Sequence, residues 1–191
     1  MSRHAHKFQA EGDFVERLEG KERQDKIPAE EIVHRMGLSG DETVIDLGAG
    51  TGYFTIPIAK RSYKVIAVDI EPRMISVLKQ RMSDGGPKNV EPLEAEMTSV
   101  PLPDASADRV FAAFVYHEVE SQERLLSECH RLLRPSGRLT VIDFQKRRTD
   151  LGPPVSVRKK PEHVLSTAGR MFKLVGRYET EVFYQLELQR Q

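Results

Sequence analysis

The stretch that most constrains this chain is residues 43–54, TVIDLGAGTGYF. Its apolar start, 44–47, is bounded by turn residues and predicts a short buried strand. Glycines follow at alternate positions, and apolar residues then recur with helical spacing. Glycine permits a positive φ angle and leaves room for a ligand against bare backbone, while amides at the start of the next helix favour an anionic group. The stretch therefore predicts a strand, a binding loop and a helix.

Three binding loops compete for this pattern. A phosphate-binding P-loop needs G-x-x-x-x-G-K-[ST], and the chain contains no Gly-Lys-Ser/Thr. A dinucleotide loop needs G-x-G-x-x-G, but Tyr53 occupies the place of its third glycine. The pattern D-x-G-x-G-x-G remains, complete at Asp46, Gly48, Gly50 and Gly52. A glycine-rich turn without any ligand stays open as an alternative. Asp46 lies among apolar residues, so we expect it to have a polar partner.

Composition excludes several classes of protein. The 191 residues suit one domain, and 39% hydrophobic with 30% charged residues indicates a globular chain rather than a disordered one. Lys plus Arg and Asp plus Glu both number 29, so no net charge attracts nucleic acid or a membrane. No apolar run approaches the roughly 20 residues that span a bilayer, and no secretory signal is visible. Cys129 is the single cysteine, which rules out an internal disulfide and suits the cytoplasm.

The rest of the chain alternates between predicted strands and helices. Strands are expected at 44–47, 64–69, 89–93, 108–115 and 138–144, with helices between them and a hairpin at 170–178 and 182–189. This order requires right-handed crossovers, a mostly parallel sheet and helices on both faces. We therefore predict a doubly wound α/β fold. Residues 27–191 form the domain, and the polar residues 1–26 form an arm, or a lid that folds Phe14 over the site.

Asp69 ends the second predicted strand, 19 residues beyond Gly50. In a βαβ unit this position brings its carboxylate beside the glycine loop, where it can accept both hydroxyls of a ribose. The alternative is that Asp69 only caps the following helix.

The D-x-G-x-G-x-G stretch resembles the first motif of the class I S-adenosylmethionine-dependent methyltransferases. A second stretch, EMTSVPLPD at 96–104, is followed by Asp108, an apolar strand and YHEV at 116–119. Together these motifs resemble the small methyltransferases of ubiquinone and menaquinone biosynthesis, over about residues 41–144. The chain departs from that pattern in two places, since Glu96 replaces the usual Asp and Glu118 replaces a second His.

The resemblance implies a seven-stranded sheet with a C-terminal antiparallel hairpin, S-adenosyl-L-methionine as cofactor and a small-molecule acceptor. It also implies that Glu96 reaches the adenine amino group and that Met97 packs on the adenine, the alternative for Glu96 being an exposed loop carboxylate. The residues expected to contact the cofactor are Asp46, Gly48, Ala49, Gly50, Gly52, Tyr53, Asp69, Ile70, Glu96, Met97 and Phe114.

His117, just past the fourth strand, is the candidate catalytic residue, since its free pKa near 6.5 suits a general base. The alternative is a packing or helix-start residue. Tyr53 and Tyr116 are candidates to line an acceptor pocket. The histidines are dispersed, and no metal site is expected.

The basic loop, residues 145–160, carries six Lys and Arg residues and is either solvated surface or a contact for an anionic acceptor. It leaves the carboxyl end of a strand, where open α/β sheets bind ligands. Nucleic acid and a membrane are not expected as partners, and the oligomeric state is open. Two other functions stay open: a non-catalytic sensor or partner-binding protein that binds S-adenosylmethionine, and an RNA or protein methyltransferase.

Overall fold

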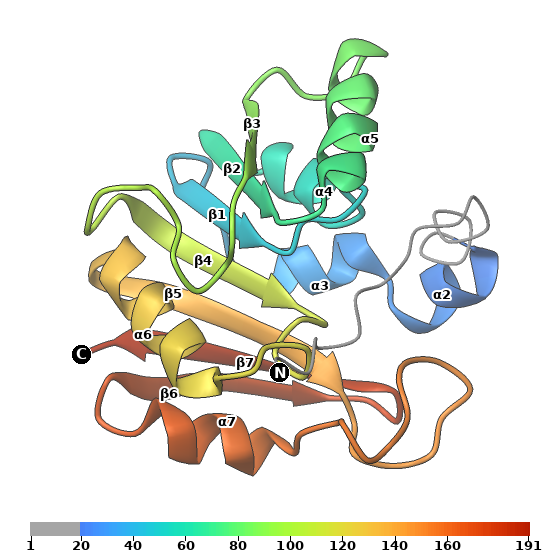
Figure 1. The fold of residues 1–191 in the computed structure, drawn as a ribbon, viewed down its shortest axis with the longest axis vertical. Coiled ribbons are helices and arrows are strands. Elements are labelled where there is room, and N and C mark those ends of the chain that lie inside the picture. Colours follow the sequence, from blue (N-terminus) through green and yellow to red (C-terminus); the bar gives the residue numbers. More distant parts are fainter. Residues whose placement is uncertain (1–19) are drawn as a thin grey trace, which may run out of the picture.

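The computed structural model describes residues 20–191, so the predicted lid residue Phe14 lies outside the described part. Figure 1 shows a central sheet with helices before and behind it. The elements, in chain order, are α2 Lys21–Lys26, α3 Ala29–Arg35, β1 Thr43–Leu47, α4 Thr55–Ala59, β2 Lys64–Asp69, α5 Pro72–Ser83, β3 Val90–Glu94, β4 Ala107–Ala113, α6 Gln122–Leu132, β5 Leu133–Phe144, α7 Pro161–Ala168, β6 Phe172–Glu179 and β7 Phe183–Arg190.

The sheet has seven strands in the order β3-β2-β1-β4-β5-β7-β6. Strands β1 to β5 pair in parallel, whereas β7 runs antiparallel to both β5 and β6. The predicted fold class is confirmed, including the C-terminal antiparallel hairpin. The strand order reverses between β1 and β4, and open α/β sheets bind their ligands at such a reversal, outside the carboxyl ends of the strands.

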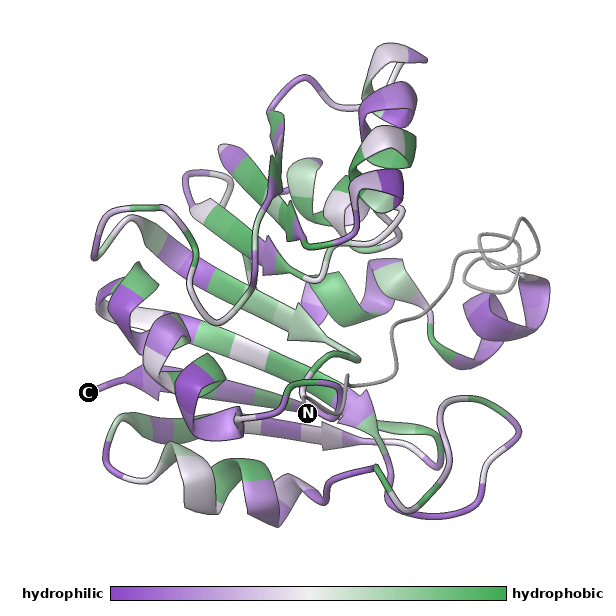
Figure 2. Cartoon of the chain, in the orientation of Figure 1, coloured by the Kyte–Doolittle hydropathy of each residue, from purple (hydrophilic) through white to green (hydrophobic). Residues whose placement is uncertain are grey.

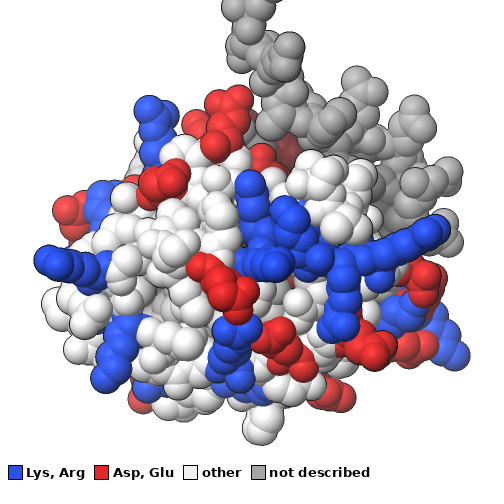
Figure 3. All heavy atoms as spheres, turned by 90° about the horizontal axis from the view of Figure 1, so that it is seen from below, with Lys and Arg blue, Asp and Glu red and all other residues white. Residues whose placement is uncertain are grey.

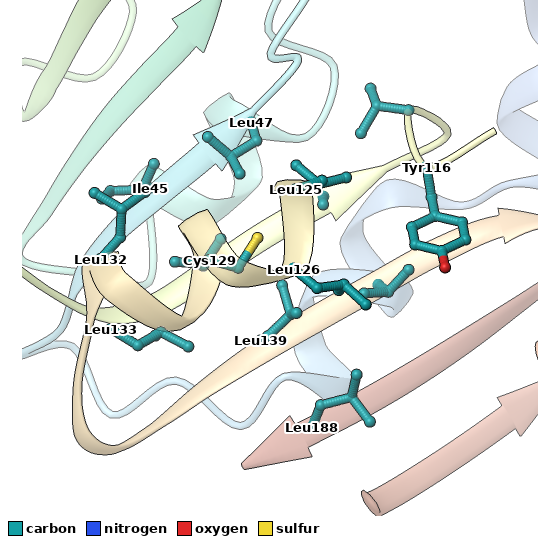
Figure 4. Close-up of a cluster of buried hydrophobic side chains, with 14 of the residues drawn as sticks. Ile45, Leu47, Tyr116, Leu125, Leu126, Cys129, Leu132, Leu133, Leu139 and Leu188 are labelled. Carbon is teal, nitrogen blue, oxygen red and sulfur yellow. The ribbon is translucent and has the colours of Figure 1, made fainter. Parts of the chain in front are cut away.

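Two apolar layers hold the helices to the sheet. Residues of α6 and α7 pack on one face, and residues of α3 and α4 pack on the other. Figure 2 shows the apolar strands between the polar outer surfaces of the helices. Figure 4 shows Leu125, Cys129 and Leu132 of α6 pointing toward Ile45 and Leu139 in the sheet. The apolar residues whose spacing predicted the strands and helices are therefore the residues that fill the core.

One boundary differs from its prediction. The fifth strand was expected at 138–144, but β5 begins at Leu133, directly after α6 ends at Leu132. The tripeptide 135–137, Pro-Ser-Gly, lies inside β5, with Ser136 at a φ of 63°. An irregularity in the pairing of β4 with β5 accommodates it, because residues that turn the chain are tolerated in a strand at a bulge.

Candidate functional site

The glycine loop, residues 48–52, needs glycine for its backbone conformation. Gly48, Gly50 and Gly52 have φ angles of 73°, 55° and 94°, in the left-handed region that other residues rarely adopt. Two of the positions are also crowded. A Cβ at Gly48 would clash with Val115, and one at Gly52 would lie 2.6 Å from the side chain of Leu78. A Cβ at Gly50 would meet nothing within 4 Å.

The amides of this loop are mostly engaged within the protein. Gly48 N and Ala49 N both donate to Val68 O, at 2.8 and 2.9 Å, and Gly50 N donates to Asp69 Oδ2 at 2.8 Å. The sequence predicted free amides for an anionic group at the following helix. These loop amides instead fasten the loop to the end of β2, so a ligand here would contact a preformed surface.

Asp46, near the end of β1, is buried and has the polar partner that its apolar neighbours required. Thr55 Oγ1 donates to Asp46 Oδ2 at 2.6 Å. Burial raises the pKa of Asp46 to about 7; the hydrogen bond from Thr55 opposes that shift, and the charge of Asp69 adds to it. The protein therefore holds a carboxyl group under the glycine loop that titrates near neutral pH.

Asp69 lies where the sequence placed it, against the glycine loop. Its second oxygen, Oδ1, accepts the amide of Glu71 at 2.9 Å. Burial raises the pKa of Asp69, although the backbone hydrogen bonds from Glu71 and Gly50 oppose the shift. A carboxylate that accepts two amides retains lone pairs for further donors. The next residue, Ile70, is 60% exposed, which is unusual for isoleucine and leaves an apolar surface beside the carboxylate.

Glu96 and Met97 follow β3 at the same edge of the sheet. The exposed carboxylate of Glu96 accepts the hydroxyl of Thr98 at 2.6 Å. The methyl group of Met97 lies beside the glycine loop, 3.7 Å from a Cβ built at Gly48. Met97 is thus placed for the predicted contact, whereas the arrangement of Glu96 fits both its predicted role and its alternative.

Tyr53 and Phe114 lie against α2 and the residue that follows it. Tyr53 Oη donates to Ile27 O at 2.6 Å, and the guanidinium of Arg23 lies 5.7 Å from the Tyr53 ring and 5.2 Å from the Phe114 ring. Phe114 is buried and has a φ of 59°, which for a bulky residue stores backbone strain. These contacts bring α2 against the glycine loop, as an arm over the site would require.

His117 is held by an acid that the sequence analysis missed. Its Nδ1 lies 2.7 Å from Oδ1 of Asp143, and its backbone amide donates to Oδ2 of the same carboxylate at 3.0 Å. Asp143 lies near the end of β5 and is fully buried. An acid among apolar residues at the carboxyl end of a predicted strand was the available signal, and the same signal had already identified Asp69.

The pKa of His117 is raised. Burial alone would lower it, but the hydrogen bond and charge of Asp143 and the charge of Glu118 outweigh burial. Glu118 Oε1 lies 3.7 Å from Nε2, the nitrogen that does not face Asp143. Burial in turn raises the pKa of Glu118, as do the charges of Asp143 and Asp69, against the opposing charge of His117. These four groups therefore interact electrostatically at one edge of the sheet.

Tyr116 does not line a pocket as the sequence suggested. It is fully buried, and its hydroxyl forms a hydrogen bond of 3.1 Å with Nδ1 of His163 on α7. Burial raises its pKa to about 12. Tyr116 follows the strand and continues its alternation toward the core, so it belongs to the apolar layer under α6 and α7.

The basic loop is built around Arg158, which is only 2% exposed. Its guanidinium donates to the carbonyl oxygens of four loop residues and to a hydroxyl, at 2.8–3.1 Å: Gln145, Arg147, Leu151, Pro153 and Thr149 Oγ1. It also lies 5.3 Å from the ring of Phe144. Arg158 is therefore a structural residue and is not available to an acceptor, which corrects part of the prediction for this loop.

Within residues 20–191, no three His, Cys, Asp or Glu side chains are arranged to hold a metal ion. No helix in the same range is long and apolar enough to cross a membrane.

Comparison with known proteins gives the site its context. The methyltransferase domain family matches residues 45–141. Among curated relatives, the ubiquinone/menaquinone biosynthesis C-methyltransferase of Hahella chejuensis is 34% identical over 118 residues, which is 60% of this chain and 47% of that protein. The chain thus spans about half the length of the curated relatives it matches.

Two solved structures extend the comparison to nearly the whole fold. A SAM-dependent methyltransferase from Aquifex aeolicus superposes with a TM-score of 0.86 at 26% identity, covering 96% of this chain and 100% of that one. The [4+2]-cyclase SpnF has the same fold, with a TM-score of 0.74, 16% identity and coverage of 85% and 80%. The match over residues 45–141, which contains the glycine loop, Asp69 and His117, shows that this chain belongs to the methyltransferase domain family of S-adenosylmethionine-dependent methyltransferases.

Proposed function

We propose that this chain transfers the methyl group of S-adenosylmethionine to a small-molecule acceptor, with His117 as the base for an acceptor that must lose a proton. The observation that carries the proposal is that the glycine loop and the His117–Asp143 pair share one edge of the sheet. Val115, two residues before His117, lies against Gly48 and joins the two. Membership of the family and the names of the relatives support the reaction class.

The glycine loop fits the cofactor. The open space at Gly50 lets a ligand approach the backbone, and Asp69 has the spare lone pairs to accept ribose hydroxyls. Ile70 offers an exposed apolar side chain for the adenine, and Met97 lies beside Gly48 in the same loop. When bound, S-adenosylmethionine supplies an electrophilic methyl group on a sulfonium cation.

The geometry of His117 favours a base. A buried carboxylate can only accept, so Nδ1 of His117 carries the proton in that hydrogen bond and Nε2 of the neutral ring is left to take another. The His117 side chain is 5% exposed and Asp143 is fully buried, so the proton is taken where bulk water has little access. Dry surroundings strengthen the electrostatic part of catalysis.

The acceptor is a small molecule in this proposal, because the curated relatives are named for quinone biosynthesis. Residues 1–26 are proposed as an arm or lid on the domain at 27–191, and within the described part α2 contacts Tyr53 and Phe114 through Arg23. The single buried Cys129 supports a reducing cytoplasmic setting.

Turnover of S-adenosylmethionine against a panel of phenol, catechol and quinol acceptors tests the proposal. With an accepted substrate, His117→Gln should lower kcat by about 10²- to 10⁴-fold and leave the Kd for S-adenosylhomocysteine unchanged. Because the pKa of His117 is raised, the wild-type rate should rise with pH through a value above 6.5, and Asp143→Asn should move that rise to lower pH.

His130→Gln, on α6, is the matched control and should keep the wild-type kcat. If His117→Gln left kcat unchanged, or lowered only the melting temperature, His117 would be a packing residue. Tight binding of S-adenosylhomocysteine with no turnover on any acceptor would favour the alternative of a non-catalytic sensor.

A further inference from the structure

A shallow pocket of about 300 Å³ opens beside the basic loop. Figure 3 shows Lys and Arg side chains gathered on this face of the molecule, with acidic side chains at their border. The residues that line the pocket are Gln145, Lys146, Arg147, Lys160, Pro161, Glu162, Arg177 and Glu179. They come from the end of β5, the start of α7 and the edge strand β6.

The two acidic residues of the pocket are already engaged. Arg177 donates to Glu162 at 2.8 Å and to Glu179 at 2.5 Å, and Gln145 Nε2 donates to the other oxygen of Glu179 at 2.8 Å. Hydrogen bonds from Arg177 lower the pKa of Glu162, and those from Gln145 and Arg177 lower the pKa of Glu179. Arg177 and these two carboxylates therefore form a cluster with a net charge of −1 on one side of the pocket.

The other cations have no such partner. Within residues 20–191, no carboxylate lies within ion-pair distance of Lys146, Arg147 or Lys160, and the guanidinium of Arg147 donates to the carbonyl oxygen of Thr180 at 3.1 Å. The pocket lining thus holds four cations against two carboxylates. That excess of two positive charges matches a phosphate group, which carries about −1.5 to −2 at neutral pH, better than a single carboxylate.

The pocket adjoins the proposed methyl-transfer site. Gln145 follows Asp143 by two residues, so in extended chain the two side chains lie on the same side of the sheet. Arg158 holds the carbonyl groups of Gln145 and Arg147, and it lies close enough to His117 for its charge to act on the pKa of that residue. The pocket and the His117–Asp143 pair are therefore neighbours at this edge of the sheet.

We propose that Lys146, Arg147 and Lys160 bind a phosphate group of the methyl acceptor, so that the natural acceptor is a phosphate-bearing small molecule. This inference rests on the proposed function for its meaning, but the binding itself can be tested separately. The phosphate could belong to a free metabolite or to a lipid headgroup, and both offer the same anionic oxygens to the pocket.

The first test titrates ¹⁵N-labelled protein with inorganic phosphate, and separately with phosphatidic acid and phosphatidylcholine vesicles. Shifts should concentrate at residues 145–147 and 160–162, and Lys146→Gln/Lys160→Gln should weaken phosphate binding roughly five- to tenfold. The control Lys79→Gln/Lys173→Gln removes the same charge elsewhere and should bind like wild type. A response to phosphatidic acid vesicles alone would support the lipid source, and a response to free phosphate would support the soluble source. If Lys146→Gln/Lys160→Gln and Lys79→Gln/Lys173→Gln bound free phosphate and both kinds of vesicle with equal affinity, the inference would be overturned.

The second test compares acceptors in pairs, each with and without a phosphate group. The wild type should show the lower KM for the phosphorylated member, and Lys146→Gln/Lys160→Gln should remove that preference while kcat stays the same. A preference that survives the double substitution would overturn the inference. Failure of the proposed function would be seen elsewhere, as an absence of S-adenosylhomocysteine binding in calorimetry, and would not affect the phosphate titration.

Discussion

The glycine loop and the basic loop lie at the same edge of the sheet, after β1 and β5, but they hold their shapes in opposite ways. The glycine loop depends on backbone: three positive φ angles, and amides that donate to Val68 O and Asp69. The basic loop depends on one side chain, because Arg158 donates to the carbonyl oxygens that the loop would otherwise leave buried without a partner. The backbone conformation of the glycine loop requires glycines within the loop itself, a pattern that the sequence displays directly. The basic loop requires a side chain 13 positions away from the first carbonyl group it holds.

The largest effect should come from breaking the basic loop. Arg158→Met keeps much of the volume but leaves several buried carbonyl groups unsatisfied, and we expect the free energy of unfolding to fall by about 3 kcal/mol or more. Urea denaturation measures it, with Arg148→Met, at an exposed position, as a control that should stay within about 0.5 kcal/mol of wild type. If Arg158→Met were as stable as its control, the loop would not depend on that side chain.

The next largest effect concerns Asp46, the buried acid beneath the glycine loop. Its folded pKa of about 7 lies above the ordinary 3.8, so the folded state binds a proton that the unfolded state has released between those pH values. Stability should therefore fall as pH rises from about 4 to 7. Asp46→Asn removes this penalty and should raise the free energy of unfolding at pH 8 by about 2 kcal/mol, after the weaker hydrogen bond to Thr55 is included.

Thermal unfolding of Asp46→Asn across pH 4 to 8 checks this, with the exposed Asp41→Asn as control. A wild type and an Asp46→Asn variant with parallel pH profiles would show that Asp46 is ionised throughout. The same measurement shows whether Asp46, under the glycine loop, lowers the free energy of unfolding, whereas Arg158 in the basic loop is expected to raise it.

The smallest effect on stability, and the most specific for function, is expected at Gly50. Gly50→Ala forces alanine into a φ of 55° with open space around it, as does Gly37→Ala at a φ of 61° outside the site. Both should lose about 1–2 kcal/mol of stability. Only Gly50→Ala should weaken S-adenosylhomocysteine binding, by about tenfold or more, since the new methyl group occupies the space assigned to the ligand. If Gly50→Ala and the wild type bound S-adenosylhomocysteine with equal affinity in calorimetry, the ligand would not lie against Gly50.

What the sequence could predict follows from the same comparison. Glycine spacing and apolar runs are local signals, and they predicted the fold class, the glycine loop and the position of Asp69. The partner of His117 lies 26 residues away, on the neighbouring strand β5. Which strands become neighbours depends on the whole topology, so the sequence offered His117 as a candidate without Asp143.

The burial of charged residues was the other limit. Six basic residues in one loop predict a solvated or anion-binding surface, and nothing local separates Arg158 from Lys159 and Lys160. Arg158 is buried because the carbonyl groups of the loop turn inward around it, which is a property of the folded loop. Tyr116 is similar: its position after a strand made it a candidate to line an acceptor pocket, but it is fully buried and bonded to His163 of α7.

The measurement that tests the central claim most directly is calorimetric titration of the wild-type chain with S-adenosylhomocysteine, ATP and NADH under the same conditions. The glycine loop with Asp69 predicts one S-adenosylhomocysteine site per chain, with a Kd of about 10 μM or lower, and no detectable heat from ATP or NADH. Tighter binding of ATP or NADH than of S-adenosylhomocysteine would contradict the assignment of this loop to S-adenosylmethionine.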